Sequence, residues 1–546
     1  MISQLANLRK WLPGPSNKPA NPIPPPALPA DPSLAVVVPT PPAPPLIPLV
    51  RPNIARLAQL DADLPLFVRE SRPAMRALAL LGSLDWDHFP ERNPRRPWPG
   101  PKPMPRAPFV GSFVIKIEQN LRYMSDLREY LLDTPALVWV LGFLLVPSDA
   151  YSWGFDVEKS LPTARHFGRV LRTLPNDALQ FLLTGLVGQI VSELPPDSRF
   201  GETIATDTKH IVAWVRENNP KDYVDDRYDK TKPPKADPDC GLGCKRRHNK
   251  KSAGEGTASQ ETSSTPAATA APAPASPSTT PTTYPIPADK ARVGEFYWGY
   301  GSGVVVTKVP GWGEFLVAEL TQSFDHGDLS YFFPLMSQAE KTLGFRPRFG
   351  TFDAGFDAWY VYAHFHRDGL PWPEAFAAVA FSEKGGHKTR QFDPDGLPLC
   401  RAGLPMPLKS TFIDRTSLVE HECGRYACPL FFPARTGQPC PVGDDHWAKG
   451  GCVSCFPTSV GARLRYQIDR HSDIYKLIYK ERTASERINS QATELGIETP
   501  KLRCGKAIAN QNTLIYLIID LRALQRVRAK KAALAKQQEA NPPANG

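Results

Sequence analysis

The segment Asp473–Glu494, DIYKLIYKERTASERINSQATE, is a helical stretch with three functional side chains spaced along it. Tyr479, Arg482 and Glu486 follow one another at intervals of three and four residues, so a helix places them on one face. An acid beside a guanidinium and a phenol suits a site that holds a metal ion next to a phosphodiester, because Arg binds phosphate through two parallel hydrogen bonds. The segment therefore predicts phosphoryl-transfer chemistry.

The same tyrosine, arginine and glutamate resemble the third motif of the DDE transposases of bacterial insertion sequences, Tyr-x2-Arg-x3-Glu-x6-Lys. The family's lysine would fall at Thr493, which carries no charge. The phosphate contact that the resemblance implies there would pass to Lys501 or Arg503. The alternative is a solvated helix whose charged residues form surface pairs worth ~0.2–0.5 kcal/mol each.

Two further acids precede this helix, each after a predicted strand. In GETIATDTKHIVAW, the run Thr203–Thr206 is compatible with a β-strand and leads to Asp207. In FRPRFGTFDAGFDAWYVY, the strand Arg348–Phe352 leads to Asp353, and Ala-Gly then turns into a helix. Ligands bind at strand ends in such sheets. The pentapeptide Asp-Ala-Gly-Phe-Asp resembles the second motif of the same transposases, Asp-x-Gly-[Tyr/Phe]-[Asp/Ser].

Each upstream acid also fits a structural role. Asp207 and Asp353 could cap the N-termini of helices, which is worth about 1 kcal/mol per cap. Asp225, Asp226 and Asp357 compete for the catalytic role, but none of them directly follows an apolar strand. The order and local context of all three motifs favour the catalytic interpretation.

The resemblance implies that Asp207, Asp353 and Glu486 form a catalytic triad that binds Mg²⁺ or Mn²⁺. Two such ions ~3.5–4 Å apart hold both the attacking and the leaving oxygens of an in-line phosphoryl displacement. Mg²⁺ prefers oxygen ligands and is bound through a few carboxylates and the substrate phosphates. Asp207 and Asp353 are expected to pair, with Glu486 completing the second ion position. Tyr479 and Arg482 are expected to contact DNA.

Composition is compatible with a nucleic-acid partner. The chain has 546 residues, which predicts two or three structural units. Lys and Arg total 65 against 55 Asp and Glu, and the net charge of +10 favours a polyanion such as DNA. The longest apolar run, Ala136–Val146, is shorter than the ~20 residues that span a bilayer. We therefore expect a cytoplasmic, nucleoid-associated protein without a membrane segment.

The nine cysteines cluster in a way that favours a metal site over a secreted disulfide framework. Most lie in the loop-like, cysteine-rich segment 390–465, with His421 and His446 among them. The preferred ligands of a tetrahedral Zn²⁺ ion are four cysteines spaced as two pairs. The alternative is a set of reduced, unliganded thiols. The four cysteines are Cys423, Cys428, Cys452 and Cys455.

A basic run that begins Lys245-Arg246-Arg247 is predicted to contact DNA phosphates. The alternative is a solvated charged loop beside a linker. Leu161–Arg172, LPTARHFGRVLR, resembles the stretch that precedes the catalytic core in these transposases. The helical region around it is expected to bind DNA or pair the ends, or to serve as a purely structural bundle.

The expected fold class is α/β, with an RNase H-like mixed sheet flanked by helices, a helical N-terminal domain and a cysteine-rich insertion. Strands are predicted at Val304–Lys308 and Phe315–Leu320, and helices at 121–132, 136–146, 164–174, 178–194, 329–343 and 512–524. The expected divisions are a proline-rich disordered arm (1–55), a helical domain (56–195), three core parts (196–251, 289–389 and 466–530), a disordered Ser/Thr/Ala/Pro linker (252–288), the insertion (390–465) and a disordered tail (531–546).

The leading functional hypothesis is a DNA transposase. It would bind the terminal inverted repeats of its element, cleave DNA with Mg²⁺, and join the ends to target DNA, working as a homodimer in the complex. One alternative is a descendant that still binds DNA but has lost catalysis. Another is a zinc-stabilised interaction protein whose acids only cap helices.

Overall fold

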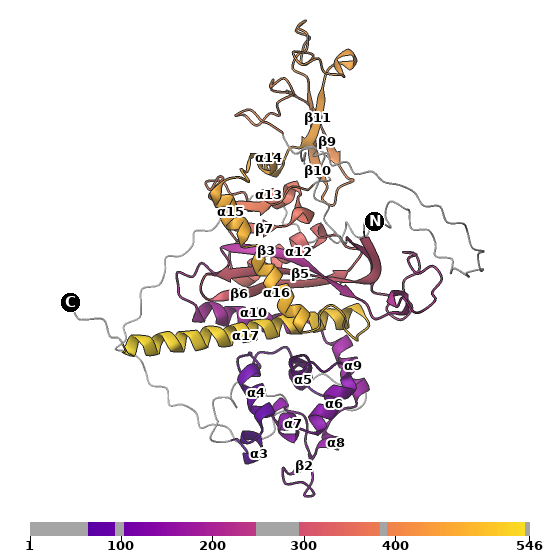
Figure 1. Ribbon diagram of the computed structural model, residues 1–546, viewed down its shortest axis with the longest axis vertical. Helices are drawn as coiled ribbons and strands as arrows, with labels where there is room; N and C mark the ends of the chain where they lie inside the picture. Colours follow the sequence, from indigo (N-terminus) through magenta and orange to yellow (C-terminus); the bar gives the residue numbers. More distant parts are fainter. Residues whose placement is uncertain (1–63, 93–102, 247–293, 383–389, 541–546) are drawn as a thin grey trace, which may run out of the picture.

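The computed structural model describes residues 64–92, 103–246, 294–382 and 390–540, and Figure 1 shows how they are arranged. They form a mixed α/β protein with a six-stranded mixed sheet, a helical N-terminal region and a separate three-stranded sheet. The predicted proline-rich arm and the Ser/Thr/Ala/Pro linker lie outside the described residues, as does Arg247.

The N-terminal region is helical, as predicted. One predicted helix ends early at Leu141 because Gly142 takes a left-handed conformation with φ of 78°, which stops the helix. The helix over 107–118 was not predicted, although it is buried along almost its whole length. The elements are α3 (Leu66–Arg69), α4 (Arg72–Leu81), α5 (Ala107–Glu118), α6 (Met124–Leu132), α7 (Pro135–Leu141), β1 (Val146–Pro147), β2 (Phe155–Asp156), α8 (Val157–Ser160), α9 (Ala164–Thr173) and α10 (Asn176–Glu193).

The six-stranded sheet has the order β4-β5-β3-β7-β8, and β6 also pairs with β5. The β3–β7 and β7–β8 pairs are parallel, and the pairs that β5 makes with β3, β4 and β6 are antiparallel. Three consecutive valines of β5, Val304–Val306, are all buried, which fits a strand covered on both faces. The strands are β3 (Thr203–Val212), β4 (Gly241–Arg246), β5 (Gly294–Val309), β6 (Gly313–Ser323), β7 (Phe349–Phe352) and β8 (Phe376–Val379).

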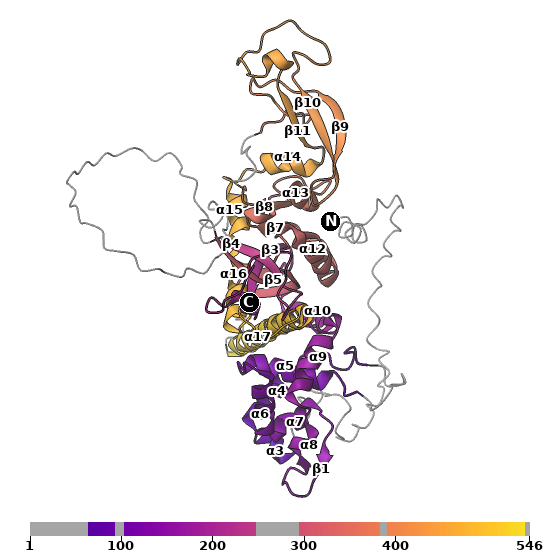
Figure 2. The same cartoon turned by 90° about the vertical axis from the view of Figure 1, so that its right-hand side faces the viewer.

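Helices cover both faces of this sheet. In Figure 2, α12 (Leu329–Leu343) lies on one side of it, and α15 (Asp473–Lys480) and α16 (Thr483–Glu494) lie on the other. α17 (Gly505–Ala540) packs on β6 and α10, and in Figure 1 it lies between the sheet and the other N-terminal helices. The predicted apolar core helix over 512–524 is confirmed as part of α17, since Leu514–Leu517 are all buried. α17 continues into the segment that was expected to be a disordered tail.

The insertion contains regular structure, so the prediction of a loop-like segment is wrong. Its strands form an antiparallel sheet in the order β11-β10-β9, which protrudes at the top of Figure 2. β9 is exposed at nearly every residue and therefore lacks the alternation of apolar and polar residues that reveals a half-buried strand. The insertion contains β9 (Leu408–Asp414), β10 (His421–Ala427), β11 (Val453–Pro457), a 3₁₀ turn at Trp447–Lys449 and most of α14 (Val460–Gln467). Outside it lie α13 (Trp359–Phe365) and a 3₁₀ turn at Arg216–Asn218.

Two predicted elements have different bounds in the structure. The helix expected over 473–494 is divided into α15 and α16, and the strand expected over 203–206 continues as β3 to Val212. The helix predicted over 329–343 is confirmed at both ends as α12. Across the described residues, no helix is both long enough and apolar enough to cross a membrane.

Candidate carboxylate site

Asp207 on β3 and Asp353, just after β7, lie close together because β3 and β7 are neighbouring parallel strands. β3 pairs with β7 so that Thr203 is level with Phe349 and Ala205 with Thr351. Continuing this register by two residues brings Asp207 level with Asp353, and neighbouring strands are about 4.8 Å apart. The two acids are 146 positions apart in the sequence, and the parallel register brings them together. Asp207 is not the last residue of its strand, but it lies where β3 passes beyond the end of β7.

The surroundings of Asp207 disfavour its charge. Burial raises the pKa of Asp207 to about 6, and the charge of Asp353 raises it as well. The hydrogen bond from the Thr208 amide to Oδ1 (2.9 Å) and the one from Asn489 Nδ2 to Oδ2 (3.0 Å) act in the opposite direction on this pKa. Asp207 lies within a strand and caps no helix, so the capping alternative is wrong for this residue.

Asp353 immediately follows β7 and, as its alternative interpretation predicted, caps the 3₁₀ turn Ala354–Phe356. Its Oδ1 accepts a hydrogen bond from the Gly355 amide at 2.9 Å. Burial raises the pKa of Asp353, and the nearby charge of Asp328 raises it further. A Cβ at Gly355 would lie 2.6 Å from Asp328 Oδ2 and 3.0 Å from Asp353 Oδ1, so a side chain there would displace these carboxylates from the turn.

Arg482 lies at the junction between α15 and α16. The backbone stays helical there through i→i+3 hydrogen bonds, including Arg482 N to Tyr479 O at 3.1 Å and Ser485 N to Arg482 O at 3.2 Å. The guanidinium pairs with Glu486 at 2.5 Å. Its charge partly offsets the burial that raises the pKa values of Asp207 and Asp353. One cation therefore acts on all three acids of the predicted triad.

Glu486 lies in the first turn of α16, pairs with Arg482, and has a side chain that is 50% exposed. Asn489, which donates to Asp207, follows Glu486 by three residues. Side chains at that spacing are neighbours on a helix, with Cβ atoms ~5–6 Å apart. The structure thus places Glu486 about one helical turn from the residue that touches Asp207.

Sequence reasoning missed Asp328 and Asn489. Asp328 directly precedes α12, where an acid normally indicates a helix cap, yet its side chain makes no capping hydrogen bond. Its Oδ1 instead accepts from Thr208 Oγ1 at 2.8 Å. Asn489 shares a helical face with Glu486, and that spacing was the available signal. The Asp328–Thr208 and Asn489–Asp207 contacts both join segments that are distant in the chain, so local sequence patterns do not predict them.

Neither a scan of protein-family models nor a search of curated proteins matches this chain. Any assignment of function therefore depends on the chemistry of the carboxylate group itself. Asp207 within β3, Asp353 just after β7 and Asp328 just before α12 bring negative charge together, and Glu486 already pairs with Arg482. Such a group can hold divalent cations, whose preferred ligands are carboxylate oxygens.

The other residues with expected DNA contacts lie in different parts of the fold. Tyr479 is partly buried and stacks on Tyr475 with ring centroids 5.7 Å apart. Thr493, at the position of the family's lysine, donates its hydroxyl to Asn489 O at 2.9 Å. Lys245 and Arg246 lie on β4 at an edge of the sheet.

Lys501 and Arg503 flank the ring of Trp214, which follows β3. Their charged groups lie 5.5 Å and 4.6 Å from the centroid of that ring, and Trp214 is 40% exposed. All three residues line a surface cavity of about 410 Å³ that also includes Arg216. Lys501 and Arg503, the predicted substitutes for the family's phosphate contact, thus lie beyond the C-terminal end of β3.

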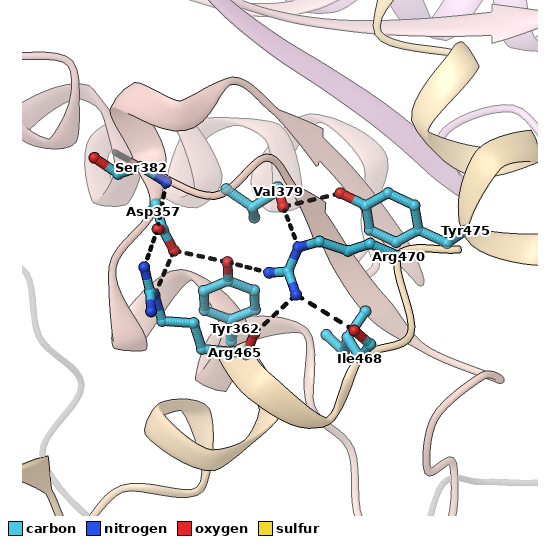
Figure 3. Close-up of polar contacts among 8 residues, drawn as sticks. All are labelled: Asp357, Tyr362, Val379, Ser382, Arg465, Ile468, Arg470 and Tyr475. Carbon is cyan, nitrogen blue, oxygen red and sulfur yellow. Dashed lines mark hydrogen bonds and ion pairs between the residues drawn. The ribbon is translucent and has the colours of Figure 1, made fainter. Parts of the chain in front are cut away.

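The competitor Asp357 has a structural role, as Figure 3 shows. Its carboxylate accepts two hydrogen bonds from Arg465 (2.8 and 2.5 Å), one from the Tyr362 hydroxyl (2.8 Å) and one from the Ser382 amide (2.8 Å). Arg470 donates to the same tyrosine hydroxyl at 2.9 Å. This network joins the turn after Asp353 to the segment that enters α15. The other competitors, Asp225 and Asp226, lie in a loop, where Asp226 pairs with a lysine.

The four cysteines of the predicted zinc set divide into two pairs on opposite faces of the small sheet. β10 and β11 pair with Arg425 opposite Cys455, so Cys423 and Cys455 lie on one face of their sheet. Cys428 and Cys452 immediately follow and precede these strands, and the alternation of side chains assigns them to the opposite face. This arrangement cannot hold one ion between all four thiols, so the predicted ligand set is wrong.

Proposed function

We propose that this chain is a DDE-type transposase whose mixed sheet is an RNase H-like core. It would bind the inverted repeats at the ends of its element and carry out Mg²⁺-dependent DNA strand cleavage and strand transfer. The observation that carries the proposal is the parallel register that sets Asp207 level with Asp353. The helix with Glu486 and Arg482 lies against the same strand end, which agrees with the order of the three sequence motifs.

The carboxylate group fits a divalent cation. Burial and the charge of a neighbouring acid raise the pKa values of both Asp207 and Asp353, which is the electrostatic condition that a bound cation relieves. Asp207 and Asp353 would hold Mg²⁺ together, and Glu486 would hold a second ion at the exposed edge. When bound, these ions activate the attacking oxygen and stabilise the leaving oxygen of a phosphoryl displacement.

The remaining side chains would orient the acids and the substrate. Asn489 and the Thr208 amide each bind one oxygen of Asp207, which fixes the plane of that carboxylate. Arg482 would bind a DNA phosphate with the nitrogen atoms that Glu486 leaves free, because a guanidinium carries five N–H donors. Cleavage by water would leave a 3′-hydroxyl, and that hydroxyl would attack target DNA in the same site. Both steps exchange one phosphodiester oxygen for another.

The decisive test is Mg²⁺-dependent nicking of a DNA duplex that carries the ends of the element. Inverted repeats flanking several near-identical copies of the coding sequence would identify those ends. We expect Asp353→Ala to lower the nicking rate by roughly 10³-fold or more, as loss of a group that acts directly in catalysis does. Asp473→Ala is a matched control, since this acid is fully exposed at the start of α15. Equal rates for Asp353→Ala and the parent would remove Asp353 from the site.

The same assay separates the proposal from an inactive descendant. If the parent binds the repeats specifically but does not nick them with Mg²⁺ or Mn²⁺, the chain has kept DNA binding and lost catalysis. Circular dichroism of each variant excludes misfolding as the cause of a lost rate.

A further inference from the structure

Three side chains of different chemistry meet at one end of the β9–β10 hairpin. Asp414 is the last residue of β9 and lies directly opposite His421, the first residue of β10. Cys423 follows His421 by two residues and therefore lies on the same face. One carboxylate oxygen, one imidazole nitrogen and the Cys423 sulfur all lie within 4.8 Å of one another. The group is separate from the carboxylate site on the large sheet.

The imidazole of His421 is oriented as in a metal ligand. Its Nδ1 lies 2.8 Å from the backbone oxygen of Val419, so it donates a proton there and leaves the Nε2 lone pair free. Nε2 lies 3.4 Å from Cys423 Sγ. The ring packs against Trp359, with centroids 5.0 Å apart, and Cys423 is only 6% exposed.

Neighbouring hydrogen-bond donors fix the orientation of the Asp414 carboxylate. Its Oδ1 accepts hydrogen bonds from the amide and hydroxyl of Thr416, at 2.8 and 2.7 Å, and its Oδ2 accepts from Ser417 at 3.3 Å. Partners of this kind fix the direction of a ligating carboxylate. All three candidate ligands are therefore supported by neighbouring groups.

We propose that Asp414, His421 and Cys423 bind a Zn²⁺ ion. Zn²⁺ takes thiolate, imidazole and carboxylate ligands at about 2.3, 2.0–2.1 and 2.0–2.2 Å. Ligand atoms around a tetrahedral ion of that size are ~3.3–3.7 Å apart, so the present group needs only a small contraction. The fourth position falls to water or to Cys455, which lies on the same face of the sheet.

The ion would act as a structural clip. It would join the two ends of the turn between β9 and β10, in a hairpin whose first strand is exposed at nearly every residue. Metal binding adds its free energy to the folding of such a segment. Because His421 also packs on Trp359 at the start of α13, the clip would fix the small sheet relative to the turn that follows Asp353.

The test is Zn²⁺ binding by the full chain in the absence of DNA, measured against a chromophoric chelator. We expect His421→Ala and Cys423→Ser each to weaken binding by more than the roughly 10–100-fold that loss of an outer partner costs. Cys452→Ser is the matched control, because this cysteine belongs to the opposite face, and its Zn²⁺ affinity should equal that of the parent. Replacing Zn²⁺ with Co²⁺ should give a thiolate-to-metal absorption band that Cys423→Ser removes.

Asp414→Asn keeps the shape of the side chain and serves where a larger change disturbs folding, which circular dichroism would reveal. Full affinity in His421→Ala or Asp414→Asn would overturn the assignment. Equal loss in Cys452→Ser and Cys423→Ser would also overturn it and place the ion among the cysteines alone. Neither result depends on nicking activity, so it leaves the transposase proposal to its own test.

Discussion

Asp353 and Asp357 are four positions apart in the chain, yet their surroundings are opposite. Asp357 has a side chain with 0% exposure, and two nitrogens of Arg465, a tyrosine hydroxyl and an amide satisfy it (Figure 3). Asp353 faces Asp207 and Asp328, and its pKa is raised by burial and by the charge of Asp328. A buried acid with a full set of partners supports the fold, whereas clustered acids short of positive charge leave room for a cation from outside.

The largest expected effect comes from breaking the satisfied network. Asp357→Ala leaves Arg465, whose side chain is 12% exposed, without its counter-charge. We expect a loss of about 3–5 kcal/mol in the free energy of unfolding, measured by urea denaturation. Replacing both partners, as in Asp357→Leu with Arg465→Met, should recover much of that loss. The exposed Asp473→Ala variant should leave the midpoint unchanged. A midpoint that also stays unchanged in Asp357→Ala would mean that the ion pair does not support the fold.

Removing the charge of Asp207 should instead increase the free energy of unfolding. The pKa of Asp207 is about 6 in the folded chain against an ordinary value of 3.8, so between these values the folded state holds a proton that the unfolded state has lost. Stability therefore falls as pH rises through this window, and the penalty above pH 6 approaches about 3 kcal/mol. Asp207→Asn should be more stable than the parent at pH 8, and the difference should vanish towards pH 4.

Urea denaturation of Asp207→Asn and the parent at both pH values measures this difference. The matched control is Asp473→Asn, the same substitution at an exposed acid of α15. A variant less stable than the parent at pH 8 would show that Asp207 supports folding as Asp357 does.

A smaller effect should follow from adding the missing cation. At a Mg²⁺ concentration of 100 times its dissociation constant, the parent should gain about 2.7 kcal/mol in its free energy of unfolding. Asp353→Asn should gain far less, because one of the two paired ligands has lost its charge. NaCl at matched ionic strength controls for screening. Equal gains in both proteins would place the bound Mg²⁺ outside the pair.

The smallest expected effect concerns DNA. Thr493→Lys restores the charge that the resembling transposases carry at this position, one helical turn from Asn489, which donates to Asp207. One added phosphate contact should steepen the dependence of log affinity on log salt concentration by about 0.9. Thr493→Gln, with a long uncharged side chain, is the control and should leave the slope unchanged. An unaltered slope in Thr493→Lys would place the DNA backbone away from this turn of α16.

The sequence predicted those parts of the fold that carry local signals. α12 was predicted at both ends because a regular apolar pattern is followed by Gly344, which takes φ of 76° at the end of the helix. Asp353 was predicted at the end of a short apolar strand, and β7 has that form. The division between α15 and α16 was missed because neither glycine nor proline marks it.

The candidate sites were predictable only where spacing matches geometry. The acids came from motif order, but the register that aligns Asp207 with Asp353 is a property of strand pairing. The predicted set of four zinc ligands does not converge, because cysteines spaced five and three residues apart fall on opposite faces once the segment forms strands. The contacts of Asp328 with Thr208 and of Asn489 with Asp207 join distant segments, and only the spacing of Asn489 from Glu486 hinted at either of them.

The position of α17 has a consequence for synthesis. This helix covers part of the large sheet, yet it follows every strand of that sheet in the chain. We therefore expect part of the apolar surface of the sheet to stay exposed during translation until residues 505–540 have emerged. Exposed apolar surface of this kind binds chaperones or promotes aggregation. Ribosome-bound chains stopped before Gly505 should accordingly bind an apolar dye more strongly than chains that include α17. For this protein, the risk of aggregation is greatest between the synthesis of the segments that carry the three acids and the synthesis of α17.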